Sequence, residues 1–175
     1  LVVKTGYLFF KNELGVRLII LLMNTATIFV LEKIINPKNL KLYYAIIASI
    51  VLIHSVGVLA VPDIPLFFFT TTFFYLYKLY LNKPSWQIML LIGFNCGLLL
   101  LSKYHGILVI GFTLLSNLKL LRKWETWLAM LLALLLFLPH ILWQINNDFP
   151  TIGYQLLDRE KTRFDYTYVL EFIFT

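Results

Sequence analysis

Long apolar runs, separated by short polar connections, limit the folds that this chain can adopt. Helices of about 20 apolar residues cross a bilayer, and in hydrocarbon every backbone polar group must be bonded within the protein. The runs therefore predict an all-α fold, a polytopic transmembrane helix bundle of about six transmembrane helices plus the start of a seventh near Tyr166. The six candidate spans are residues 16–35, 42–61, 65–81, 86–101, 106–118 and 127–145.

The composition agrees with a membrane protein and excludes several other classes. Hydrophobic residues make up 60% of the chain, charged residues only 14%, and the mean hydropathy is +0.81. The net charge of +6 does not indicate a nucleic-acid partner, because Lys and Arg lie in short clusters between the apolar runs. The single cysteine, Cys96, lies inside an apolar run and belongs to no CxxC motif, so no disulfide framework is expected.

The distribution of charge predicts the orientation of the bundle. One alternating set of connections carries the bases and, by the positive-inside rule, should face the cytoplasm. The other set comprises residues 62–65, 102–106 and 146–165, and it should face outward with Asp63, Asp148, Asp158, Glu160 and Asp165. The bases expected on the cytoplasmic side are Lys33, Lys38, Lys41, Lys78, Lys83, Lys119, Arg122 and Lys123.

Two charged residues in short outward connections are candidates for a catalytic or ligand-binding role. Asp63, in "PDIP", has a local interpretation as the N-cap of the third helix, with Pro65 in the first turn. The same place would suit a carboxylate that holds a divalent metal beside a phosphate. Lys103, in "SKYHG", is either a lysine that reaches the lipid headgroups or a point charge for a phosphate, and we favour the second interpretation.

Other polar and small residues have simpler structural interpretations. Glu13 and Arg17 are spaced for a salt bridge along one helical face. Gly93 and Gly97 form a GxxxG pattern that favours close helix packing. Pro139 should kink or end the sixth helix. His54, His105 and His140 are interpreted as bundle or interfacial residues, and "DREKTR" at 158–163 as a solvated stretch.

Four stretches together resemble the glycosyltransferase family 39 group, the dolichyl-phosphate-mannose-protein mannosyltransferase-like proteins of bacteria. They are "GYLFFKNELGVRL", "VPDIPLFFFT", "GLLLLSKYHGILV" and "LLLFLPHILWQINND", which follow in order through most of the chain. The resemblance implies a GT-C fold in the bacterial inner membrane with an active site on the periplasmic face. It also implies an inverting transfer of a sugar from a polyprenyl-phosphate donor to a lipid, glycan or protein acceptor.

The resemblance also implies roles for individual residues. By position, Asp63 matches an acidic residue near the donor phosphate or a divalent metal, and Lys103 matches a basic residue that faces the same cavity. Arg159 and Gln155 fall where related proteins carry polar residues that bind the donor or substrate. The main catalytic acid of such proteins is expected in a loop before "GYLFF". Residues 1–175 are therefore expected to be part of one transmembrane glycosyltransferase domain, truncated at both ends and lacking that acid.

Two functions from other classes compete with the transferase. A transporter or flippase of lipid-linked intermediates should carry polar residues deep within several helices, whereas the notable polar residues here gather at one surface. A non-catalytic membrane partner would be favoured if the whole protein had no acidic residue in the loop before "GYLFF". No certain cofactor is indicated, and the expected partners beyond donor and acceptor are membrane lipids.

Overall fold

The structure, a computed structural model, describes residues 11–50 and 61–153, and all the regular elements in these residues are helical. This confirms the predicted all-α bundle. The chain divides into two compact units, Leu1–Phe137 and Leu138–Thr175. The predicted seventh helix near Tyr166, together with Gln155, Arg159 and His54, lies outside the described residues.

The first unit holds most of the helices. In chain order the elements are α2 (Glu13–Ile35), α3 (Leu40–Ser49), α5 (Asp63–Asn82), α6 (Trp86–Ser102), α7 (Gly106–Ser116), the 3-10 helix η1 (Leu118–Arg122), α8 (Trp124–Asn146) and α9 (Pro150–Gly153). The first unit ends within α8, at Phe137.

The helices differ in whether they are long enough to cross a membrane. Among the described residues, three segments are both long and apolar enough, namely Arg17–Ile35, Asp63–Asn82 and Trp124–Asn146. The helices α3, α6 and α7 are also apolar but have 10, 17 and 11 residues. The described parts of the six predicted spans therefore form three long apolar helices and three shorter ones.

The second predicted span, 42–61, is described continuously only up to Ile50, where its helix α3 has already ended. The helix α3 ends at Ser49, and Ile50 has a non-helical ψ of 88°. The Ser49 hydroxyl donates to the carbonyl of Ile46, and such local side-chain bonds compete with helical bonds. The run from 42 to 61 is mostly apolar, so hydropathy alone did not reveal this end.

Asparagines define the hairpin formed by α2 and α3. The side chains of Asn12 and Asn39 accept hydrogen bonds from Gly15 and Leu42 at the starts of the two helices. Asn36 ends α2 in the left-handed conformation, with φ of 48°, and its N–H bonds back to the carbonyl of Glu32. Two tyrosines then tie α3 to α2: Tyr43 donates to the carbonyl of Ile28, and Tyr44 donates to the Glu32 carboxylate.

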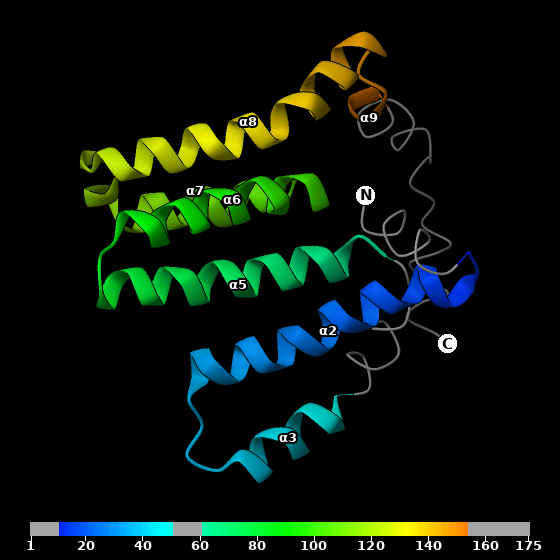
Figure 1. Cartoon of the computed structure of the whole chain (residues 1–175), viewed down its shortest axis with the longest axis vertical. Coiled ribbons are helices and arrows are strands. Elements are labelled where there is room, and N and C mark those ends of the chain that lie inside the picture. Colours follow the sequence, from blue (N-terminus) through cyan, green and yellow to red (C-terminus); the bar gives the residue numbers. More distant parts are fainter. Residues whose placement is uncertain (1–10, 51–60, 154–175) are drawn as a thin grey trace, which may run out of the picture. The chain divides into compact units, whose positions relative to one another are not determined.

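The helix α5 lies at the centre of the first unit, between α2 on one side and α6 on the other (Figure 1). The helices α2 and α5 run in the same direction, so Lys78 near the end of α5 can donate to the carbonyl of Ile34 near the end of α2. The helix α6 runs back, so the end of α6 lies at the start of α5. The buried core between these helices includes Phe73, Tyr80 and Met89.

Glycines allow α6 to lie close to the first part of α8, as the GxxxG pattern predicted. A Cβ atom on Gly93 would lie 2.5 Å from the carbonyl oxygen of Ala129, and one on Gly97 would lie 2.8 Å from Leu136. Real Cβ atoms do not approach that closely, so both positions need glycine. The predicted close packing is confirmed.

The second unit is described from Leu138 to Gly153 and contains the end of α8 and the short α9. Pro139 lies inside α8 and does not end it, because the helix continues to Asn146. The turn that follows contains two consecutive residues with positive φ, Asp148 at 57° and Phe149 at 53°.

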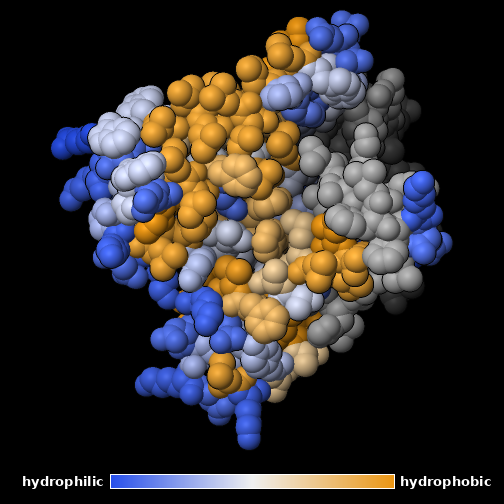
Figure 2. All heavy atoms as spheres, viewed as in Figure 1, coloured by the Kyte–Doolittle hydropathy of each residue, from blue (hydrophilic) through white to orange (hydrophobic). Residues whose placement is uncertain are grey.

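Apolar side chains cover much of the surface shown in Figure 2, as expected for a protein whose solvent is lipid. Hydrophilic side chains gather where the α2–α3, α5–α6 and α7–α8 connections lie. These connections carry the bases that the sequence predicts to be on one side of the membrane. We call this the basic end of the first unit.

Candidate functional site

Asp63 stands at the opposite end of the first unit, in the first turn of α5. It is the first helical residue, whereas the cap residue is Pro62, which provides no side-chain cap bond. The interpretation of Asp63 as an N-cap was therefore wrong, because "VPD" places the proline, rather than the acid, at the half-helical position. Ile64 and Pro65 are buried and fix the start of the helix. A carboxylate in this first turn is favoured by the helix dipole.

Lys103 lies where α6 ends. Its backbone has left the helix, with φ of −160° and ψ of 138°, while its N–H still bonds to the carbonyl of Leu99. A cation is favoured at the carboxyl end of a helix, for the same reason that an acid is favoured at its start. The antiparallel arrangement of α5 and α6 thus brings a preferred acid position next to a preferred base position.

The two predicted residues meet in an ion pair. The ammonium nitrogen of Lys103 donates to Oδ1 of Asp63 at 2.5 Å. The side chain of Lys103 is 36% exposed and that of Asp63 is 59% exposed, so both can still reach a ligand. Ion pairs this exposed contribute only about 0–1 kcal/mol to stability. The pair is therefore poorly explained as a device that holds the fold together.

The turn that carries Lys103 is held on both sides. It has three residues, 103–105, and α7 begins at Gly106, whose N–H bonds to the carbonyl of Lys103 at 2.9 Å. A Cβ atom on Gly106 would lie 2.7 Å from Leu99, so only glycine lets α7 begin so close to α6. The ring of Tyr104 contacts that of Phe137 edge-on, with centroids 6.3 Å apart. The sequence analysis missed this contact, since nothing in the sequence pairs those two positions.

The remaining predicted residues are separate from this pair. His105 is exposed at the same turn. Glu13 and Arg17 form the predicted salt bridge, at 3.5 Å, with side chains that are 88% and 50% exposed.

The described surroundings of Asp63 contain a cation and no cluster of further metal-binding side chains. One carboxylate oxygen is bonded to an ammonium group, which competes with a cation for the same position. Among residues 11–50 and 61–153 no group of three His, Cys, Asp or Glu side chains is placed to hold a metal. The possible role of Asp63 as a metal ligand therefore stays a prediction.

At the basic end, two lysines are engaged in structural contacts. Lys78 donates to the carbonyls of Ile34 and Lys33, at 2.7 and 3.3 Å, and so satisfies the carboxyl end of α2. Lys123 donates to the hydroxyl of Tyr80 at 3.0 Å and lies 4.8 Å from the centre of its ring. Sequence reasoning found these lysines only as orientation signals. The carbonyl and tyrosine partners come from helices that are distant in sequence.

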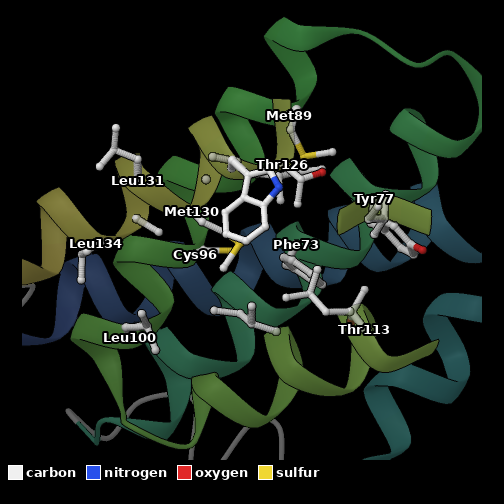
Figure 3. A pocket seen from close by; sticks show the side chains of 18 of the residues that line it. Phe73, Tyr77, Met89, Cys96, Leu100, Thr113, Thr126, Met130, Leu131 and Leu134 are labelled. Atoms are coloured by element: carbon white, nitrogen blue, oxygen red, sulfur yellow. The ribbon is translucent and has the colours of Figure 1, made fainter. Parts of the chain in front are cut away.

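A cavity of about 480 Å³ lies among α5, α6, α7, η1 and the first part of α8 (Figure 3). Apolar and aromatic side chains form almost all of its lining, among them Phe73, Met89, Cys96 and Leu134. Figure 3 shows Thr126 at this lining, where it is one of the few polar side chains. Lining residues extend from Leu120, near the basic end, to Leu100, three residues before Lys103.

Comparison with known proteins identifies the family. A protein-family model described as dolichyl-phosphate-mannose-protein mannosyltransferase matches residues 5–143, a range that includes both Asp63 and Lys103. Gln155 and Arg159 lie beyond it. Neither the curated proteins nor the solved structures gave a significant match. Because the match covers most of this helical chain, the chain belongs to the dolichyl-phosphate-mannose-protein mannosyltransferase family, and thus to the class of membrane glycosyltransferases.

Proposed function

We propose that this chain is part of an enzyme that transfers a sugar from a polyprenyl-phosphate-linked donor to a lipid, glycan or protein acceptor on the outer face of a bacterial inner membrane. The observation that carries the proposal is the Lys103–Asp63 ion pair, which is exposed at the end of the bundle opposite the basic end. Family membership supplies the reaction class. By the positive-inside rule, a basic end in the cytoplasm would leave the pair on the outer side.

In the proposed reaction an oxygen of the acceptor hydroxyl attacks the anomeric carbon of the donor sugar. The bond from that carbon to the phosphate oxygen breaks, and the bonding electrons leave with the polyprenyl phosphate. The acceptor proton passes to a general base, and a single displacement inverts the anomeric configuration. Negative charge grows on the leaving phosphate, so a fixed cation beside it lowers the barrier.

Lys103 is the residue that we assign to the leaving phosphate. Its ammonium group is a compact charge with three donors, of which Asp63 takes one in the described conformation. Asp63 would hold the ammonium group in place and lie within the donor phosphate site, without acting as the principal base. The principal base, and contributions from Gln155 and Arg159, are expected from outside the described residues.

The buried polar groups of the first unit favour the transferase over a transporter. The side-chain amide of Asn95, in the middle of α6, donates to the carbonyl of Phe69 at 2.8 Å. Thr27, Thr71 and Thr113 donate their hydroxyls to carbonyls in their own helices. These groups serve local structure, so they do not form a polar path between the two ends.

The test replaces each member of the pair in the full-length enzyme. Membranes that contain Lys103→Gln or Asp63→Asn are assayed for release of polyprenyl phosphate from a polyprenyl-phosphate mannose donor, which is the sugar named by the family. We expect loss of about 10²-fold in rate for Lys103→Gln, because one charge-stabilising donor is removed. Lys83→Gln, an exposed lysine at the basic end, is the matched control. Rates near wild type for both variants at equal expression would reduce the pair to a surface contact.

A further inference from the structure

The cavity in the first unit is open to the surface that would face lipid. Several of its lining side chains are more than half exposed, including Ile107, Trp127 and Leu134. An apolar chain could therefore enter from the side of the bundle rather than from water. The indole N–H of Trp127 donates to the carbonyl of Leu121 at 2.9 Å, which fixes this side chain next to η1. The cavity thus adjoins the basic end.

Thr126 differs from other threonines in the described helices. Although the residue is only 4% exposed, its hydroxyl has no hydrogen-bond partner among the described residues. Thr126 is the third residue of α8, so the carbonyl four residues earlier lies in η1 and outside the helix. A buried hydroxyl without a partner is costly, and a bound molecule with an oxygen acceptor would relieve that cost. The threonines that instead bond to the carbonyl four residues earlier are Thr27, Thr71, Thr72 and Thr113.

Cations stand beside the same part of the cavity. Lys119 and Arg122 belong to η1, are exposed, and form no ion pair with any residue that the structure describes. Lys123 is already bonded to Tyr80. The acid nearest in sequence is Glu125, so the segment from 119 to 125 remains positively charged. An anionic group with an apolar tail complements this combination of charges and cavity.

We propose that the cavity binds one acyl chain of an anionic phospholipid. The phosphate lies on Arg122 and Lys119, and a glycerol-ester oxygen accepts the hydrogen bond of the Thr126 hydroxyl. This site lies at the end of the bundle opposite Asp63 and Lys103, and it does not depend on the proposed sugar transfer. It is a structural lipid site rather than a donor site.

The first experiment is native mass spectrometry of the purified full chain in detergent. The probes are phosphatidylglycerol and phosphatidylcholine with identical acyl chains. We expect one phosphatidylglycerol to be retained preferentially, and Thr126→Val to weaken its binding about fivefold, the effect of one hydrogen bond. The matched control is Thr113→Val, at a residue that lines the same cavity but whose hydroxyl is already bonded to Val109. It should leave binding unchanged.

Two further variants, with one control, separate binding of the lipid headgroup from binding of the acyl chain. Arg122→Gln should remove the preference for phosphatidylglycerol over phosphatidylcholine, whereas Lys41→Gln, on α3 at the same end, should preserve it. Leu134→Trp fills the cavity and should reduce retention of both lipids. Equal retention of both lipids by the wild-type chain, with no effect of Thr126→Val, would overturn the proposal in favour of ordinary surrounding lipid.

A competition between two lipids for the wild-type chain tests the proposal without relying on variants, which could fold poorly. Polyprenyl phosphate is added to the complex with phosphatidylglycerol at equal concentration. The proposal expects phosphatidylglycerol to remain bound, because the polyprenyl phosphate headgroup belongs at the opposite end. Displacement of the phospholipid would show that the cavity holds the donor tail, and would also overturn the proposal.

Discussion

The two ends of the first unit use lysine in different ways. At the basic end, Lys78 and Lys123 donate to backbone carbonyls and to a tyrosine hydroxyl, groups that belong to the fold. At the other end, Lys103 donates to the Asp63 carboxylate, and both side chains remain partly exposed. In the first arrangement the lysine ammonium groups bond to groups of the fold. In the second, the ammonium group of Lys103 can also bind an incoming phosphate.

This difference shows that position and partner, rather than charge alone, indicate which lysines serve function. A lysine that satisfies the last carbonyls of a helix is part of the scaffold, because those carbonyls would otherwise lack a partner. A lysine paired with an exposed carboxylate contributes little to stability and can exchange its partner. Three experiments test this difference between the two ends.

The largest effect is expected from exchanging the charges of the exposed pair. The double variant Asp63→Lys with Lys103→Asp keeps an attraction between α5 and α6 but moves the cation to α5. Transfer should remain about 10²-fold below wild type, because the cation no longer stands where the phosphate needs it. The melting temperature in detergent should fall only slightly, since each charge now opposes a helix dipole worth about 0.3–1 kcal/mol. Activity restored above that of the single variants would show that the pair is purely structural.

An intermediate effect is expected from Lys78→Met, which removes the donor to the carbonyls of Ile34 and Lys33. The free energy of unfolding should fall by about 1 kcal/mol, while sugar transfer by the intact enzyme changes less than twofold. The measurement is thermal unfolding in detergent beside the transfer assay. Lys83→Met, an exposed lysine at the same end, is the control. A Lys78 variant that loses transfer at full stability would contradict the division between the ends.

The smallest effect is expected from Arg17→Gln, which breaks the salt bridge with Glu13 near the start of α2. Both side chains are at least half exposed and lie one helical turn apart. The loss should be under about 0.5 kcal/mol, and raising the salt concentration should make variant and wild type indistinguishable. A larger loss that persists in high salt would mean that exposed pairs matter to this fold, which would weaken the argument for Asp63 and Lys103.

Much of the bundle was predictable because hydropathy and helix ends are local properties. The starts of α5, α6 and α7 lie within two residues of prediction, since proline, serine and glycine mark them. The end of α3 at Ser49 was missed because it falls inside a mostly apolar run. Counting helices placed Asp63 and Lys103 on the same side of an up-and-down chain, whereas their direct ion pair was seen only in the structure.

Contacts between distant helices were not predictable in the same way. The donation from Lys78 to the end of α2 depends on which helices pack side by side, and counting helices does not give that. The missing partner of Thr126 depends on η1 breaking the helical ladder just before α8. A threonine in an apolar run gives no sign of this in one sequence. Side-chain partners set by packing therefore needed the structure.

The short turn after α6 also limits how the proposed site can move. Gly106 lies close to Leu99 and the turn has only three residues, so the backbone at Lys103 is too short to move as a loop. Any response of this charge to an arriving phosphate must come from rotation of its own side chain. Such rotations take picoseconds to nanoseconds, whereas loop closures take microseconds or longer. Capture of the phosphate by Lys103 should then be limited by how fast the donor diffuses in the plane of the membrane.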